Sequence, residues 1–141
     1  MSAAACKHAR PDHVAISGRD GSVLSMAYTT CTQLNRSRAS VSRCTMDWMD
    51  RSTWPYQNYD VLLASNVLYE KASIIPLVNV LEFYLCNRAD NTWKQAIIVD
   101  PVNQVNRGAF CYAAHKAGLD VKSTPFPGMD DFVLLKIAPF K

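Results

Sequence analysis

The sequence lacks a hydrophobic run long enough to cross a membrane. A spanning helix needs about 18 or more consecutive apolar residues, and no segment approaches that length. The amino-terminal stretch MSAAACKHARPDH also has no apolar core of the kind that a secretory signal contains. These absences predict a soluble protein of the cytoplasm, with the nucleus as the alternative, and no membrane partner.

The cysteines and histidines show no pattern that would hold a metal ion or a disulfide framework. The chain has 5 cysteines and 3 histidines, and none of the cysteines forms a CxxC pair. Dispersed, odd-numbered cysteines are typical of buried reduced thiols, and the histidines lack metal-ligand spacing. We therefore expect no structural metal. The cysteines are Cys6, Cys31, Cys44, Cys86 and Cys111.

Strong charge of one sign is also absent, because the formal net charge is only +3. The one local concentration of positive charge is Arg36, Arg38 and Arg43. Proteins that bind single-stranded nucleic acid interleave such cations with aromatic side chains, and no aromatic platform lies between these arginines. We expect a solvated loop and helix end here, and no nucleic-acid partner.

Glycine is scarce: the chain has 5 glycines, and no two of them form a GxGxG-type cluster. A glycine-rich loop lets the backbone approach a bound cofactor closely, so no segment of the sequence is suited to that task. The composition is otherwise that of a globular protein, with 49% hydrophobic and 19% charged residues. Its 141 residues fit one domain.

Helix and strand patterns alternate along the chain. Apolar residues at helical spacing predict helices, and short continuous apolar runs such as DVLLAS and QAIIV predict strands buried on both faces. Gly118 follows the last predicted helix in the position of a left-handed cap. The predicted helices are 2–9, 22–34, 73–85 and 107–117; the predicted strands are 13–17, 41–46, 60–65, 95–99, 119–123 and 132–137.

This alternation predicts an α/β fold with a Rossmann-like, mostly parallel sheet that has helices on both faces. The last two strands break the rule, because only a turn containing Pro125, Pro127 and Gly128 separates them. A parallel crossover needs a dozen or more residues. The last strand is therefore predicted to be antiparallel.

Three short motifs stand at the ends of predicted strands: Met46-Asp47-Trp48, Asn66 with Tyr69, and Ile98-Val99-Asp100-Pro101. Together they resemble motifs of the class I (seven-strand) S-adenosylmethionine-dependent methyltransferases, in their lysine-methyltransferase-like branch. Met46-Asp47-Trp48 is similar to the Leu-Asp-Trp of that branch, and Asn66 with Tyr69 stands where the branch has Asp-x-x-Tyr. Ile98-Val99-Asp100-Pro101 resembles its fifth strand and the Asp-Pro that often follows. The resemblance extends over residues 2–140 and depends on the order of these motifs and on the reversed last strand.

The resemblance also implies what this sequence does not contain. Residues 2–5 resemble the first helix of the family and residues 13–17 its second strand, so the first strand and the glycine loop are missing. Residues 1–141 then form a single but incomplete methyltransferase-like domain. Loss of a central strand costs about 5–15 kcal/mol if some five buried backbone groups lose their partners. Either the neighbouring strands pair directly, or the fragment is marginally stable, or a partner chain covers the exposed sheet edges.

The resemblance implies that the cofactor S-adenosylmethionine contacts residues that follow the predicted strands 13–17 and 41–46. Gly18 stands where the family has an acid for the ribose hydroxyls, and Asp20 either replaces that acid or caps the next helix. Asp47 and Trp48 stand where the family contacts adenine. The alternative for this pair is a surface acid beside a core tryptophan.

Asn66 and Tyr69 are the predicted catalytic residues, and Asn66 is also predicted to contact the cofactor. Methyl transfer depends mainly on placement of a neutral nucleophile in line with the methyl group. Asn66 replaces the acid that would hold an ammonium, which favours a neutral nitrogen over lysine, unless Glu70 restores the charge. For Tyr69 the alternative is a packed loop aromatic, and for Asp100 a structural turn.

Two functions follow from the resemblance. The first is an S-adenosylmethionine-dependent methyltransferase that, in its complete form, methylates a nitrogen of a protein side chain. The second is a non-catalytic methyltransferase-like remnant or subunit that needs a partner to complete its sheet. Whether this chain is an enzyme by itself stays open at this point.

Overall fold

The computed structural model describes residues 11–35, 39–86 and 94–140, which fall into two compact units, Met1–Tyr56 and Gln57–Lys141. The predicted helix 2–9, Cys6, Arg36 and Arg38 lie outside the described residues. Within the described ranges, no helix is both long and apolar enough to cross a membrane.

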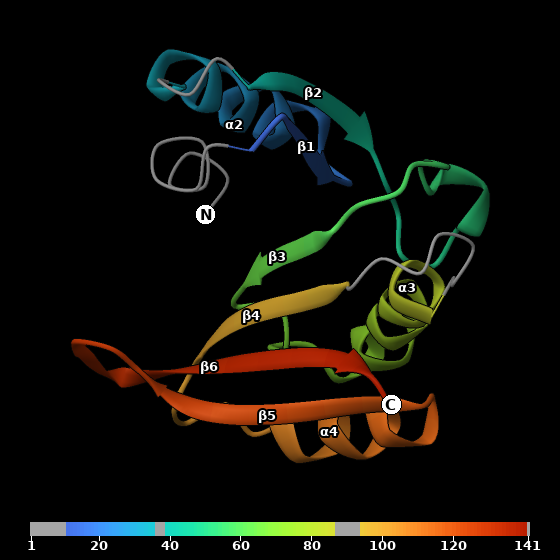
Figure 1. Ribbon diagram of the computed structural model, residues 1–141, viewed down its shortest axis with the longest axis vertical. Coiled ribbons are helices and arrows are strands. Elements are labelled where there is room, and N and C mark those ends of the chain that lie inside the picture. Colours follow the sequence, from blue (N-terminus) through green and yellow to red (C-terminus); the bar gives the residue numbers. More distant parts are fainter. Residues whose placement is uncertain (1–10, 36–38, 87–93, 141) are drawn as a thin grey trace. The chain divides into compact units, whose positions relative to one another are not determined.

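The first unit is a β-α-β arrangement (Figure 1). Strand β1 (His13–Gly18) pairs in parallel with β2 (Ser40–Thr45), and helix α2 (Gly21–Leu34) connects them. Ile16, Leu24 and Cys31 form the buried core between helix and strands. A short 3₁₀ helix, η1 (Arg51–Thr53), follows β2. The positions of both strands agree with the sequence analysis to within one or two residues.

The second unit contains a four-stranded sheet in the order β3-β4-β6-β5 (Figure 1). β3 (Val61–Ser65) and β4 (Gln95–Pro101) are parallel, whereas β6 (Met129–Pro139) is antiparallel to both of its neighbours, β4 and β5 (Leu119–Phe126). The α/β class and the reversed last strand are therefore confirmed. β6 lies inside the sheet, and β3 and β5 form its edges.

Two helices pack on the sheet of the second unit. α3 (Ile74–Cys86) follows the 3₁₀ helix η2 (Lys71–Ser73), and α4 (Arg107–Lys116) connects β4 to β5. They contact each other and the strands. On one face of the sheet, alternate residues of β4 and two residues of β6 are buried, because successive strand residues point to opposite faces. The buried residues of that face are Ala96, Ile98, Asp100, Leu135 and Ile137.

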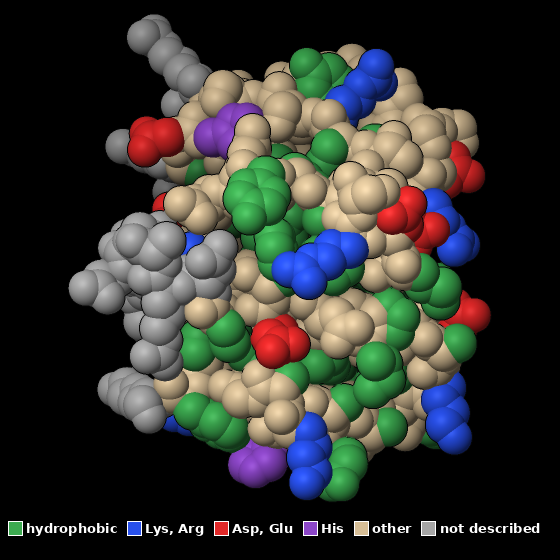
Figure 2. All heavy atoms as spheres, turned by 90° about the vertical axis from the view of Figure 1, so that its right-hand side faces the viewer, with side chains coloured by type: hydrophobic (Ala, Val, Ile, Leu, Met, Phe, Trp, Pro, Cys, Tyr) green, Lys and Arg blue, Asp and Glu red, His purple; other side chains and the backbone are tan. Residues whose placement is uncertain are grey.

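The expectation that β3 is buried on both faces is not met. Val61 and Leu63, which alternate with the half-buried Leu62 and Ala64, are 43% and 40% exposed. In a half-exposed strand, polar residues usually alternate with apolar ones and mark the solvent face. The run DVLLAS is almost entirely apolar, so the sequence does not show which face of β3 is exposed. Hydrophobic side chains are also exposed elsewhere, and Figure 2 shows one face where they lie among single acidic and basic residues.

The final hairpin is tighter than expected. The structure extends β5 through Pro125 to Phe126 and leaves Pro127 and Gly128 as a two-residue turn. Proline followed by a glycine with a φ of +77° is typical of a type II turn. Pro125 is compatible with β5 because β5 is an edge strand.

Gly118 ends α4 in the left-handed conformation, with a φ of +80°, as expected. A Cβ at this position meets no atom within 4 Å, so the cost of Gly118→Ala is one of backbone strain, about 1–2 kcal/mol. We expect urea unfolding to show that loss. Gly108→Ala is the matched control, because Gly108 is helical and equally open, and the same substitution should stabilise α4 by about 0.5–1 kcal/mol. Equal effects of the two substitutions would contradict the strain argument.

Candidate functional site

The carboxyl ends of β1 and β2 meet in the first unit and bring four predicted cofactor residues to one edge. The backbone N–H of Met46 donates to the carbonyl of Gly18 at 3.1 Å. This bond makes Gly18 a neighbour of Asp47 and Trp48, although they are far apart in the sequence. Asp20 follows directly, at the start of α2.

Asp20 is the N-cap of α2, which was one of the two expected roles. Its Oδ1 accepts from the backbone N–H groups of Ser22 at 2.8 Å and Val23 at 3.2 Å, and from the Ser22 hydroxyl at 2.6 Å. The Ser22 hydroxyl, followed by the two N–H groups, lowers the pKa of this carboxyl below its ordinary value. All three bonds use the same oxygen, and the carboxylate stays charged beside the helix N-terminus.

The segment after β2 is held by Trp54, which binds the backbone of the half-buried Asp47. The indole Nε1 of Trp54 donates to the carbonyl of Asp47 at 2.8 Å, and Thr53 Oγ1 donates to the same carbonyl at 3.2 Å. Oδ1 of Asp47 accepts from the N–H of Met49 at 2.9 Å. Trp54 is thus a structural tryptophan, and Trp48 lies half-buried in a fixed turn.

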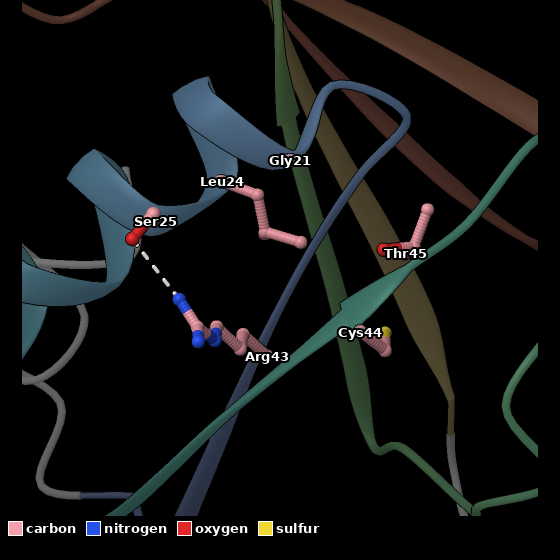
Figure 3. Close-up of a pocket in the computed structure, with 6 residues that line it drawn as sticks. All are labelled: Gly21, Leu24, Ser25, Arg43, Cys44 and Thr45. Carbon is pink, nitrogen blue, oxygen red and sulfur yellow. Dashed lines mark hydrogen bonds between the residues drawn. The ribbon is translucent and has the colours of Figure 1, made fainter.

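A hollow of about 450 Å³ lies between α2 and β2 in the first unit (Figure 3). Arg43 crosses it and donates to the hydroxyl of Ser25 at 3.0 Å, and its guanidinium lies 5.4 Å from the ring centre of Tyr28. The guanidinium of Arg43 therefore joins β2 to α2 through Ser25 and Tyr28. Its lining residues are Gly21, Leu24, Ser25, Arg43, Cys44 and Thr45.

The second unit brings the ends of β3 and β4 together. Asn66, immediately after β3, has a φ of +51°, and its backbone N–H donates to the carbonyl of Val99 at 2.8 Å. Among the non-glycine residues that the structure describes, Asn66 alone has a positive φ. Non-glycine residues in this conformation cost free energy and are found disproportionately at functional sites. The side chains of Asn66 and Tyr69 are exposed, that of Tyr69 by 70%.

Asp100, at the end of β4, is completely buried and pairs with Arg107. Oδ2 of Asp100 lies 3.4 Å from an Nη of Arg107, and the guanidinium also donates to the carbonyls of Pro101 and Val102. Burial raises the pKa of Asp100 above its ordinary value, and the charge of Arg107 opposes that rise. Asp100 Oδ1 and Arg107 Nε have no hydrogen-bond partner. The pair therefore fixes the turn after β4.

Sequence reasoning missed Arg107 and Asn106. The amide Nδ2 of Asn106 donates to the carbonyl of Leu68 at 2.8 Å, across 38 positions of the chain. Asn106 directly precedes the predicted helix 107–117, so its position in the sequence indicates a helix N-cap. The sequence contains no pattern that predicts its contact with the segment after β3.

The predicted site residues thus lie at the strand ends of the two units. Gly18, Asp20, Asp47 and Trp48 belong to the first unit; in the second, Asn66 and Tyr69 follow β3 and Asp100 lies near the end of β4. Within the described ranges no three histidine, cysteine, aspartate or glutamate side chains converge as metal ligands. In open parallel sheets, ligands bind at the carboxyl ends of strands, where these residues lie.

Comparison with known proteins establishes the fold. A candidate methyltransferase from Pseudomonas syringae is 16% identical, with a TM-score of 0.59 over 91% of this chain and 73% of that one. A methyltransferase from Pyrococcus furiosus is 12% identical, with a TM-score of 0.59 over 89% of this chain and 61% of that one. LepI in complex with S-adenosylmethionine is 14% identical, with a TM-score of 0.59 over 98% of this chain and 40% of that one.

The chain therefore has the fold of the S-adenosylmethionine-dependent methyltransferases of class I, and it spans between 40% and 73% of the length of these three proteins. No family model matches the chain. No curated protein matches it in sequence either.

Proposed function

We propose that this chain is an S-adenosylmethionine-dependent methyltransferase of the lysine-methyltransferase-like branch, and that its complete form methylates a nitrogen of a protein side chain. The fold and the position of the predicted site residues at carboxyl strand ends support this proposal. The same fold can serve other chemistries, so the function depends on the site residues.

The observation that carries the proposal is the left-handed backbone of Asn66. The bond from its N–H to Val99 holds the residue at the end of β3 and leaves the amide side chain exposed. Bound S-adenosylmethionine would supply a methyl group on a positively charged sulfur. Asn66 and Tyr69 would place the accepting nitrogen in line with that group, Asp47 and Trp48 would contact the adenine, and Asp20 beside Gly18 would contact the ribose.

The amide of Asn66 favours a neutral acceptor nitrogen. An amide oxygen accepts a hydrogen bond from an N–H group but carries no charge to hold an ammonium ion. An imidazole or another neutral nitrogen fits these groups better than a protonated lysine. Glu70 lies four residues further on, but its carboxylate accepts from the hydroxyl of Ser73 at 3.0 Å.

Isothermal titration with S-adenosylhomocysteine tests the cofactor site, after circular dichroism has shown that the protein is folded. We expect micromolar binding by the wild type and about tenfold weaker binding by Asn66→Gly, which keeps the positive φ but removes the amide. Asn58→Gly is the matched control, in an exposed loop before β3. No binding by a folded wild type at millimolar ligand would contradict the proposal.

A second function, a non-catalytic methyltransferase-like subunit, is favoured by the strand edges. In the described ranges β1 pairs with β2 only and β3 pairs with β4 only. A strand from a partner chain would satisfy the backbone groups of these edges. The second function is also supported by two substitutions relative to the family: Gly18 and Asn66 each stand where the family has an acid. Methyl transfer by the purified chain alone would refute it.

A further inference from the structure

The segment between β3 and η2, residues 66–70, is fixed at three points. At its start the N–H of Asn66 donates to Val99, and at its end the N–H of Ser73 donates to the carbonyl of Glu70 at 3.1 Å. In its middle the carbonyl of Leu68 accepts from Asn106 at 2.8 Å. The first two bonds are made by backbone groups, and the Ser73 hydroxyl also donates to the Glu70 carboxylate at 3.0 Å. Of these bonds, the one from Asn106 is made by a side chain that lies beyond β4 in the sequence.

Asn106 holds this segment instead of capping its own helix. It occupies the N-cap position of α4, where an asparagine ordinarily accepts from the N–H groups of the first turn, but its side chain makes no capping bond. Its backbone is helical, with φ of −85° and ψ of −4°, rather than extended as at an ordinary N-cap. The first turn of α4 also contains no acidic residue. The side chain of Asn106 thus does not cap α4, and its amide instead donates to the segment 66–70.

The bond has no simple replacement from solvent. Leu68 is completely buried, and Asn106 is itself partly buried. A buried carbonyl that loses its donor is left without a partner, which disfavours the conformation that buries it. Asn106 is held in turn by the neighbouring Arg107, whose guanidinium binds Asp100 and the carbonyls of Pro101 and Val102.

We propose that Asn106 is a positioning residue for the site at the end of β3: through Leu68 it holds residues 66–70 so that Asn66 and Tyr69 present their side chains in one arrangement. This inference rests on the proposed function for its effect on ligand binding. Its effect on the segment itself is independent of any ligand.

Two substitutions separate positioning from helix stability. Asn106→Asp removes the donor and puts a carboxylate near the carbonyl of Leu68, but an acid at the N-terminus of a helix is favourable to that helix. Asn106→Ser is an equally good cap that is too short to reach Leu68. A residue that serves only the helix would tolerate both changes. Asn103→Asp is the matched control, at an exposed position three residues earlier in the connection between β4 and α4.

Nuclear magnetic resonance of the full chain is the first measurement. In Asn106→Asp and Asn106→Ser we expect the backbone order parameters of residues 67–70 to fall from about 0.85 to below about 0.6. Exchange of the Asn66 amide should become about tenfold faster, as loss of one supporting hydrogen bond implies. The order parameters of α4, and all values in Asn103→Asp, should not change. Unchanged order parameters in Asn106→Asp would overturn the inference.

Titration with S-adenosylhomocysteine then links the segment to the site. We expect its dissociation constant to rise about 3- to 10-fold in both Asn106 variants and to be unchanged in Asn103→Asp. A more mobile segment with an unchanged dissociation constant would overturn the positioning role. Absence of binding by the wild type would contradict the proposed function, whereas the order parameters would still decide whether Asn106 holds residues 66–70.

Discussion

Replacing Arg107 by methionine should destabilise the second unit by about 3–5 kcal/mol at neutral pH. Asp100 has no exposed surface, and Arg107 is the group that binds its carboxylate, so the substitution leaves a buried charge without a counterion. The substitution also removes the donors to Pro101 and Val102. Urea unfolding followed by circular dichroism measures the loss.

The loss of unfolding free energy in Arg107→Met should grow as the pH rises. Burial raises the pKa of Asp100 above its ordinary value of 3.8, and removal of Arg107 raises it further. The folded variant then binds a proton more tightly than the unfolded chain does. The contribution of Asp100 to its stability is therefore greatest in acid and falls as the pH rises from 3.8 through the raised folded pKa, so the difference from the wild type shrinks toward acid pH. A destabilisation that does not shrink toward acid pH would contradict this account.

Two controls show whether burial is the cause. Lys122→Met breaks the exposed pair of Lys122 and Asp120, whose side chains are 76% and 49% exposed, and should cost less than about 1 kcal/mol. The double substitution Asp100→Leu with Arg107→Met replaces both charges by apolar groups and should recover most of the stability. Failure of the double variant to recover would mean that the bonds of Arg107 to the turn carbonyls dominate.

Truncation of Phe110 to alanine should destabilise the second unit by about 3–5 kcal/mol. Phe110 is completely buried in α4, and α4 packs against α3 and β5. Removing the ring loses its transfer free energy and leaves a cavity where the side chain was completely buried. The measurement is the free energy of urea unfolding, with an unchanged m-value showing that the transition remains two-state.

The matched control for this truncation lies on the same helix. Tyr112 is 68% exposed, so Tyr112→Ala should change the unfolding free energy by about 0.5 kcal/mol or less. Similar losses for both truncations would mean that helix propensity, and not core packing, determines the effect. α4 begins directly after Asn106, so Phe110→Ala should also loosen residues 66–70.

The fold was predictable because its signals are local. Apolar runs such as HVAIS and QAIIV placed the strands, and Gly118 correctly marked the end of a helix by its ability to adopt a positive φ. The connection between the last two strands was too short for a parallel crossover, and the reversed β6 is observed. The one-sided burial of β3 was not predictable, because a continuous apolar run does not show which face the neighbouring helices cover.

The candidate site was predictable only in part. The residues after each strand could be named, because carboxyl strand ends follow from strand positions. The bond from Met46 to Gly18, which brings the ends of β1 and β2 together, was seen only in the structure. That Asp20 caps α2 was seen only from its bonds to Ser22 and Val23. These bonds use one of its two carboxylate oxygens, and its contact with the ribose stays a prediction.

The sequence by itself determined the order of the elements, the α/β class and the reversed last strand, since these depend on neighbouring residues. Only the tertiary structure decided that Asn66 adopts a positive φ, that Asp100 pairs with Arg107 in a buried turn, and that Asn106 reaches Leu68. The physical reason is that a donor far along the chain satisfies a buried polar group only after the sheet and helices have brought the two together.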